Sequence, residues 1–131
     1  MNQELSFINT FIKKRLKNRY LDLLQNDTRR KKIIKRFYHS DDIDERFKIR
    51  IEPNKQNVND IFKLLTVKRQ IRYCYIISTS SEIDQEQLLL YKALEKIVGF
   101  FPGTIISCIP GLLAYYEGEE PNERFIIEKR L

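Results

Sequence analysis

The sequence has few of the residues that metal centres and nucleophilic active sites use. Its 131 residues include one histidine, two cysteines and no tryptophan, with only four glycines and four prolines. The single histidine, His39, and the lack of a Gly-x-Ser-x-Gly segment argue against a serine-type nucleophilic centre. Cys74 and Cys108 form no Cys-x-x-Cys motif, and each lies in an apolar segment. We therefore expect buried, reduced thiols, with a disulfide or a redox pair between strands as the alternative.

Charged residues are missing from one long stretch, residues 97–116, which reads IVGFFPGTIISCIPGLLAYY. Its length matches the roughly 20 apolar residues of a membrane-spanning helix. Turn-forming dipeptides at Pro102-Gly103 and Pro110-Gly111 interrupt it, however, and each proline removes a backbone donor that a membrane helix needs. We therefore predict no membrane association. Residues 104–109 should be an interior strand that is covered on both faces, with a neighbouring strand at residues 112–116.

The overall composition is typical of a folded, water-soluble chain, with 42% hydrophobic and 32% charged residues. A length of 131 residues predicts one domain, residues 1–131, that can bury a core without disulfides. The opening MNQELSF has no basic segment followed by an apolar run, so we expect no secretory signal and a cytoplasmic location.

The order of hydrophobic patterns predicts the fold class. We predict helices at 3–25, 29–38, 57–69 and 84–98, and strands at 47–51, 72–78, 104–109, 112–116 and 124–128. Helices between strands imply parallel pairs, and the last three strands imply an antiparallel meander. The prediction is thus an α+β fold, with two N-terminal helices followed by a mixed sheet of about five strands in the order β-α-β-α-β-β-β. Residues 1–40 should form a basic helical module packed on the α/β sheet of residues 47–131.

Positive charge is concentrated in the first part of the chain. Residues 1–50 hold 14 Lys and Arg against 7 Asp and Glu, whereas residues 51–131 hold 10 against 11. Such a concentration attracts phosphates, and Tyr20 and Tyr38 would add base stacking if they were exposed. No base-reading motif accompanies it, so a nucleic-acid contact would be independent of sequence. The alternatives are a solvated face that keeps the protein soluble and a contact with an acidic protein. The residues predicted to bind an anion are Arg15, Arg19, Arg29, Arg30, Lys31, Lys32 and Arg36.

The second predicted helix begins with Arg29-Arg30-Lys31-Lys32, which is the wrong sign for a helix N-terminus. Either the helix runs unbroken through residues 26–28, or an anionic partner completes the site. Asp27 and Thr28 are the predicted caps if a new helix begins.

Two other segments are weaker candidates. The run Ser78, Thr79, Ser80 and Ser81 follows a strand and precedes the helix predicted from Asp84, a position where α/β proteins bind small ligands. Glu82 and Asp84 would repel an anion there, so simple N-capping is the competing interpretation. The acidic turn at residues 39–45 could attract a cation, but it has no glycine for a calcium loop. Salt links to the basic helices explain it better, and we predict no metal and no cofactor.

The sequence as a whole favours a non-catalytic binding or regulatory protein that contacts an anionic partner, nucleic acid or acidic protein, through its basic helices. One alternative is a small-ligand-binding protein or metal-dependent enzyme that uses residues 78–84 or 39–45. Another is a structural homo-oligomer. No set of residues identifies a catalytic centre, so the sequence favours a protein that is not an enzyme.

Overall fold

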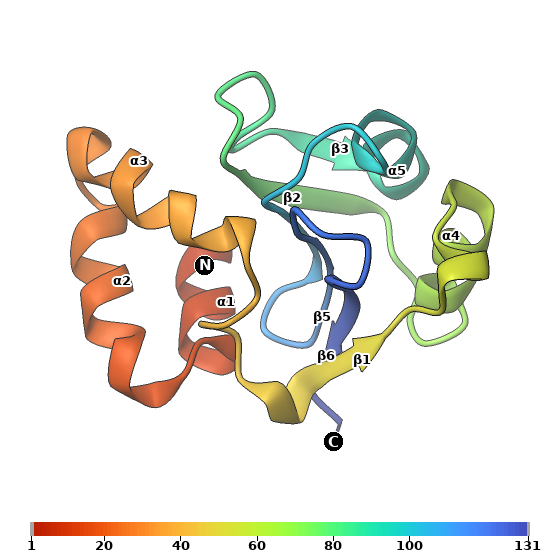
Figure 1. The fold of residues 1–131 in the computed structure, drawn as a ribbon, viewed down its shortest axis with the longest axis horizontal. Helices are drawn as coiled ribbons and strands as arrows, with labels where there is room; N and C mark the ends of the chain where they lie inside the picture. The colour runs from red at the N-terminus through yellow and green to blue at the C-terminus, as the bar shows by residue number, and fades with distance from the viewer. Residues whose placement is uncertain (1, 131) are drawn as a thin grey trace.

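The structure is a computed structural model that describes residues 2–130. It is built on one six-stranded sheet with helices on both faces (Figure 1). The strand order is β1-β6-β5-β4-β2-β3, and every neighbouring pair is antiparallel. The strands are β1 (Lys48–Arg50), β2 (Tyr73–Ser78), β3 (Gln87–Leu89), β4 (Thr104–Ile109), β5 (Leu113–Glu117) and β6 (Arg124–Glu128).

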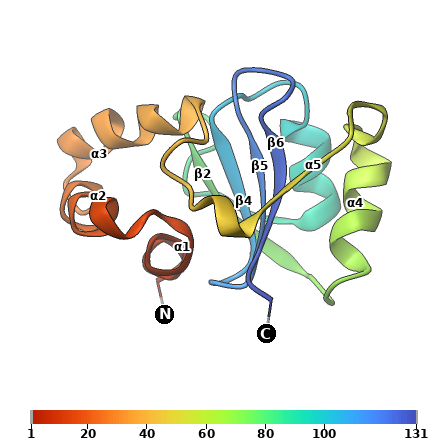
Figure 2. The same ribbon diagram turned by 60° about the horizontal axis from the view of Figure 1, so that its bottom comes forward.

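The helices form two layers, one on each side of the sheet (Figure 2). One layer consists of the first three helices of the chain and the other of the last two. The described residues contain α1 (Gln3–Phe11), α2 (Lys17–Leu24), α3 (Asp27–Ile34), α4 (Val58–Thr66) and α5 (Leu90–Ile97).

The two central strands supply side chains to both layers. Ile105 and Tyr116 pack with the first three helices, whereas Ile106 and Tyr115 pack with α4 and α5. Successive strand residues point to opposite faces, so a strand that is covered on both sides is mostly apolar along its whole length. This confirms that residues 104–109 form an interior strand, and the rest of the uncharged stretch supplies most of its neighbour, which begins at Leu113 and not at residue 112. None of the helices in residues 2–130 is long and apolar enough to cross a membrane.

The predicted α+β class is confirmed, but the sheet differs in detail. It has six strands instead of about five, and the predicted parallel pairs are absent from the described residues. Helical connections imply parallel pairs only when they join adjacent strands. Here α4 connects β1 to β2, and these strands are not neighbours. The extra strand, β3, returns alongside β2 before α5 begins.

The long helix predicted over residues 3–25 is broken into α1 and α2. Ile12 is extended and forms an isolated bridge with Ile43. The Asp44 amide donates to the Phe11 carbonyl over 2.7 Å, and the Lys13 amide donates to the Asp42 carbonyl over 2.9 Å. These hydrogen bonds to residues 42–44 take the place of the backbone hydrogen bonds that would continue the helix. The apolar periodicity continues across the break because α1 and α2 bury side chains in the same core.

The helix predicted over residues 84–98 begins later than expected. Residues 87–89 form β3, and α5 starts at Leu90. Asp84 is therefore not a helix cap; its carboxylate accepts a hydrogen bond from the Ser78 amide over 3.0 Å. Pairing of β3 with β2 outweighs the local helical pattern, so a hairpin follows the serine-rich run instead of a helix.

Gly99 and Gly103 both have positive φ, and they allow a matched test of how closely Gly103 packs against Thr79. Gly103 has φ +75°, and an added Cβ would lie 2.7 Å from Thr79 Cγ2. Gly99 has φ +84°, and its added Cβ would meet nothing within 4 Å. We expect Gly99→Ala to lower the free energy of unfolding by about 1 kcal/mol through backbone strain alone. Gly103→Ala should cost about 1–3 kcal/mol more because of the clash. Urea denaturation measures both, and equal decreases would contradict this packing.

Candidate functional site

The helix α3 carries most of the predicted anion-binding residues, and it has a true N-terminus. The Asn26 side chain caps it by accepting hydrogen bonds from the amides of Thr28 and Arg29, over 3.0 and 3.1 Å. The expectation of an unbroken helix through residues 26–28 is therefore wrong, and the cap is Asn26, one residue before the predicted Asp27. Asp27 lies in the first turn, where a carboxylate suits the helix dipole.

Helical geometry places the cations of α3 and of the following 3-10 turn, Lys35–Tyr38, on two sides of the helix. Arg30 is buried and lies on the same side as Lys31 and Lys35. Arg29, Lys32 and Arg36 line a groove between α2 and α3. Lys31 and Lys35, four residues apart, line a separate pocket on the other side of the helix.

The cationic groove is a cavity of about 360 Å³ lined by Arg19, Leu23, Arg29, Lys32, Ile33 and Arg36. Four of these six residues are cations, and no carboxylate lines it. Arg19, Arg29 and Lys32 are exposed and form no ion pair with any residue in 2–130. The groove therefore concentrates positive charge that the described chain does not neutralise.

Of the four groove cations, Arg36 alone forms an ion pair with a carboxylate within residues 2–130. Its guanidinium pairs with Asp42 over 2.5 and 3.0 Å, and the Tyr20 hydroxyl donates to the same carboxylate over 2.7 Å. Asp42 is buried, while the Arg36 side chain remains 43% exposed. The acidic turn thus supplies the salt link to the basic helices that the sequence predicted.

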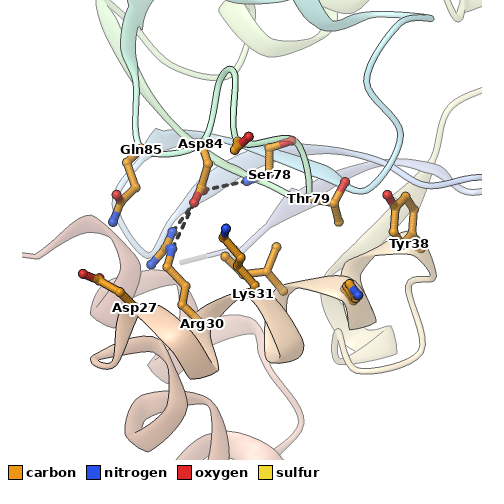
Figure 3. A pocket seen from close by; sticks show the side chains of 11 residues that line it. Asp27, Arg30, Lys31, Tyr38, Ser78, Thr79, Asp84 and Gln85 are labelled. Atoms are coloured by element: carbon orange, nitrogen blue, oxygen red, sulfur yellow. Dashed lines mark hydrogen bonds and ion pairs between the residues drawn. The ribbon is translucent and has the colours of Figure 1, made fainter.

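The Arg30 guanidinium is not free to bind an anion, which corrects the prediction. The residue is only 6% exposed, and its guanidinium binds both Glu4 carboxylate oxygens over 2.6 Å each. It also binds the Asp84 carboxylate over 2.9 and 3.0 Å (Figure 3). The Tyr75 hydroxyl donates to Glu4 over 2.7 Å. Arg30 is therefore a structural link between α1, α3 and the loop after β2.

The remaining two predicted cations, Arg15 and Lys31, lie outside the groove. Arg15 is exposed in the short 3-10 turn Lys14–Leu16 and does not line the groove. Lys31 faces the pocket on the opposite side of α3. The structure therefore brings four of the seven predicted residues together, namely Arg19, Arg29, Lys32 and Arg36.

Three residues of the serine-rich run, Ser78, Thr79 and Ser81, line the pocket beside α3, and Ser80 does not (Figure 3). The Ser78 hydroxyl lies 2.7 Å from that of Thr104 and accepts from the Ser80 amide over 3.0 Å. Because β3 follows instead of a helix, the predicted N-capping role and the phosphate-binding helix terminus are both wrong. The sequence did not predict that α3 lies beside this run or that Lys35 joins Lys31 there, although the four-residue spacing of these two lysines was a usable signal.

The described residues give little support for a metal site or for an activated nucleophile. Within residues 2–130, no group of three His, Cys, Asp or Glu side chains could hold a metal ion. His39 lies 3.0 Å from Glu123, and hydrogen bonding to that carboxylate raises its pKa. Cys74 and Cys108 are buried free thiols, as expected. Hydrogen bonding to Cys74 and burial raise the pKa of Cys108, which makes its thiol a poor nucleophile.

Comparisons with protein families, with curated proteins and with solved structures find no match for this chain. The site is therefore interpreted from its own geometry and charge.

Removing the Arg30 guanidinium should be strongly destabilising. Arg30→Met would leave two carboxylates, Glu4 and Asp84, without their cation, and breaking a buried pair in this way costs about 3–5 kcal/mol. Arg29→Met, on the exposed side of the same helix, should change the free energy of unfolding by no more than about 0.5 kcal/mol. Urea denaturation of both variants measures the difference. Similar values for the two variants would contradict the role assigned to Arg30.

The Asp42 carboxylate should make the protein sensitive to acid. Burial opposes its ionisation, but hydrogen bonds from Arg36 and Tyr20 outweigh burial and lower its pKa. Such a group stabilises the fold above its unfolded value of about 3.9 and ceases to do so as pH falls through the folded value. Asp42→Asn cannot titrate, so its unfolding free energy should fall less than that of the wild type between about pH 5 and about pH 2. Parallel pH dependences would show that Asp42 has no such effect.

Proposed function

We propose that this protein is a non-catalytic binding protein that contacts the phosphate backbone of nucleic acid through the cationic groove between α2 and α3. The observation that carries the proposal is the groove lining, in which four cations converge and three of them, Arg19, Arg29 and Lys32, have no carboxylate partner among the described residues. A partner with a dense row of negative charges satisfies such a surface better than single ions from solution.

The long-range field supports the same partner. The first 50 residues carry a net charge of +7, whereas residues 51–131 carry −1. Because the two helices of the groove belong to the positive part, approach of a polyanion would be steered toward that side of the sheet (Figure 2).

The groove favours a contact with the backbone over a contact with bases. No aromatic residue lines it. Tyr20 is buried against Phe37, with ring centroids 5.3 Å apart, so its ring is not available for base stacking. Tyr38 is half-buried and lines the other pocket. Binding that depends on phosphates alone is independent of sequence and decreases steeply with salt.

Fluorescence anisotropy with labelled mixed-sequence DNA, as a single strand and as a duplex, tests this proposal across a salt series. The wild type should bind at low salt, with log K decreasing linearly as log salt rises. The triple variant R19Q/R29Q/K32Q should bind more weakly, and its salt slope should be smaller by about 1 for each side chain that no longer binds a phosphate.

The matched control is the triple variant K63Q/R72Q/R130Q, which also removes two arginines and one lysine, all exposed and outside the groove. It should keep most of the affinity and nearly the same slope. Two results would overturn the proposal: no binding of either DNA by the wild type at low salt, or equally weakened binding in the two triple variants.

A further inference from the structure

The pocket on the opposite side of α3 is a second site with its own chemistry. It has a volume of about 540 Å³, within the range of about 300–1,000 Å³ that is typical of small-molecule sites. One wall is α3 and the turn that follows it, and the other is the end of β2 with the loop leading to β3 (Figure 3). It shares no lining residue with the cationic groove.

The pocket wall is fixed by charged groups that are already paired with one another. Arg30 and Asp84 line the pocket, but they bind each other, and Arg30 also binds Glu4. Asp84 in turn holds the Ser78 amide at the end of β2. This cluster fixes the distance between the two walls, so the cavity is held open by the fold and does not depend on a ligand to form it.

Two lysines supply the positive charge that remains. Lys31 and Lys35 are exposed, and neither forms an ion pair with a residue that the structure describes. Residues four apart on a helix lie on the same face, so both ammonium groups can reach one anion. The Lys31 side chain extends from α3 across the pocket toward Ser78 (Figure 3). Two ammonium groups with six donors suit a dianion such as a phosphomonoester.

The rest of the lining suits an uncharged body with hydroxyl groups. Asp27 and Gln85 lie together at the end of the pocket away from Tyr38 (Figure 3). The Asp27 carboxylate makes no ion pair within the described residues, so it can accept hydrogen bonds from hydroxyls. Ile34 and the half-buried Tyr38 add apolar surface.

The backbone at Gln85 is an independent sign of function at this end. Among residues 2–130, it is the only residue other than glycine with positive φ, at +71°. Its amide donates to the Ile76 carbonyl over 2.8 Å, which keeps it in this conformation. Strained positions of this kind cost about 1–3 kcal/mol and cluster at ligand sites. The strain places the Gln85 side chain at the pocket (Figure 3).

We propose that this pocket binds a small phosphomonoester with a hydroxyl-bearing body, of the size of a phosphorylated sugar. Lys31 and Lys35 hold the phosphate, and Asp27 and Gln85 hydrogen-bond to the hydroxyls. The site is independent of the cationic groove, because the two cavities lie on different sides of α3 and use different side chains.

Amide chemical shifts in two-dimensional NMR test the proposal with three probes at constant ionic strength: ribose 5-phosphate, inorganic phosphate and ribose. Ribose 5-phosphate should shift the amides of residues 27–38 and 78–85 in a saturable manner. Inorganic phosphate should bind more weakly at the same amides, and ribose should leave the spectrum unchanged. K31Q/K35Q should weaken the affinity for ribose 5-phosphate at least about tenfold, because neither glutamine can form a charge-assisted hydrogen bond to the phosphate.

The control K63Q/K129Q removes two exposed lysines elsewhere and should retain the wild-type affinity. The spectra themselves report whether each variant is folded. Three outcomes would overturn the proposal: no saturable shift with ribose 5-phosphate, equal affinity for inorganic phosphate and ribose 5-phosphate, or unchanged affinity in K31Q/K35Q. DNA binding through the groove can succeed or fail without affecting any of these outcomes.

Discussion

The buried guanidinium of Arg30 is the interaction on which the arrangement of the basic helices depends. It joins Glu4 of α1 and Asp84 of the loop after β2, so one side chain connects the N-terminal helices to the sheet. Burying these charges is costly unless every partner is in place, and the bidentate geometry with Glu4 meets that condition. With Arg30 fixed, the remaining cations of α3 are directed to the groove on one side and to the pocket on the other.

The antiparallel sheet gives this arrangement a rigid base. Its central strands are apolar on both faces because helices cover both, and this accounts for the long uncharged stretch in the sequence. The first three helices pack on one face only, so α2 and α3, which carry much of the positive charge, lie in the same layer of the molecule (Figure 2). The sheet and the two helical layers supply the buried cores, and α2 and α3 together present the cations of the groove.

Carboxylates that lie nearby in the fold determine which of the described cations are paired. Asp42 binds Arg36 and the Tyr20 hydroxyl, so this arginine is oriented at the rim of the groove. Glu4 and Asp84 withdraw Arg30 from the surface altogether. Arg19, Arg29 and Lys32 have no such partner in the described chain, which is why the groove keeps its positive potential. The net charge of the segment alone does not reveal this division.

The sequence by itself determined the α+β class, the buried strand at residues 104–109 and the concentration of positive charge in the first 50 residues. These features depend on composition and on periodic patterns within short segments. Only the tertiary structure decided that α1 ends at Phe11, that β3 replaces the start of a helix, and that Arg30 points inward. It also decided that residues 27–38 and 78–85 share one pocket. Each of these outcomes depends on partners distant in the chain, such as Ile43 for Ile12 and Asp84 for Arg30, and a local pattern contains no information about them.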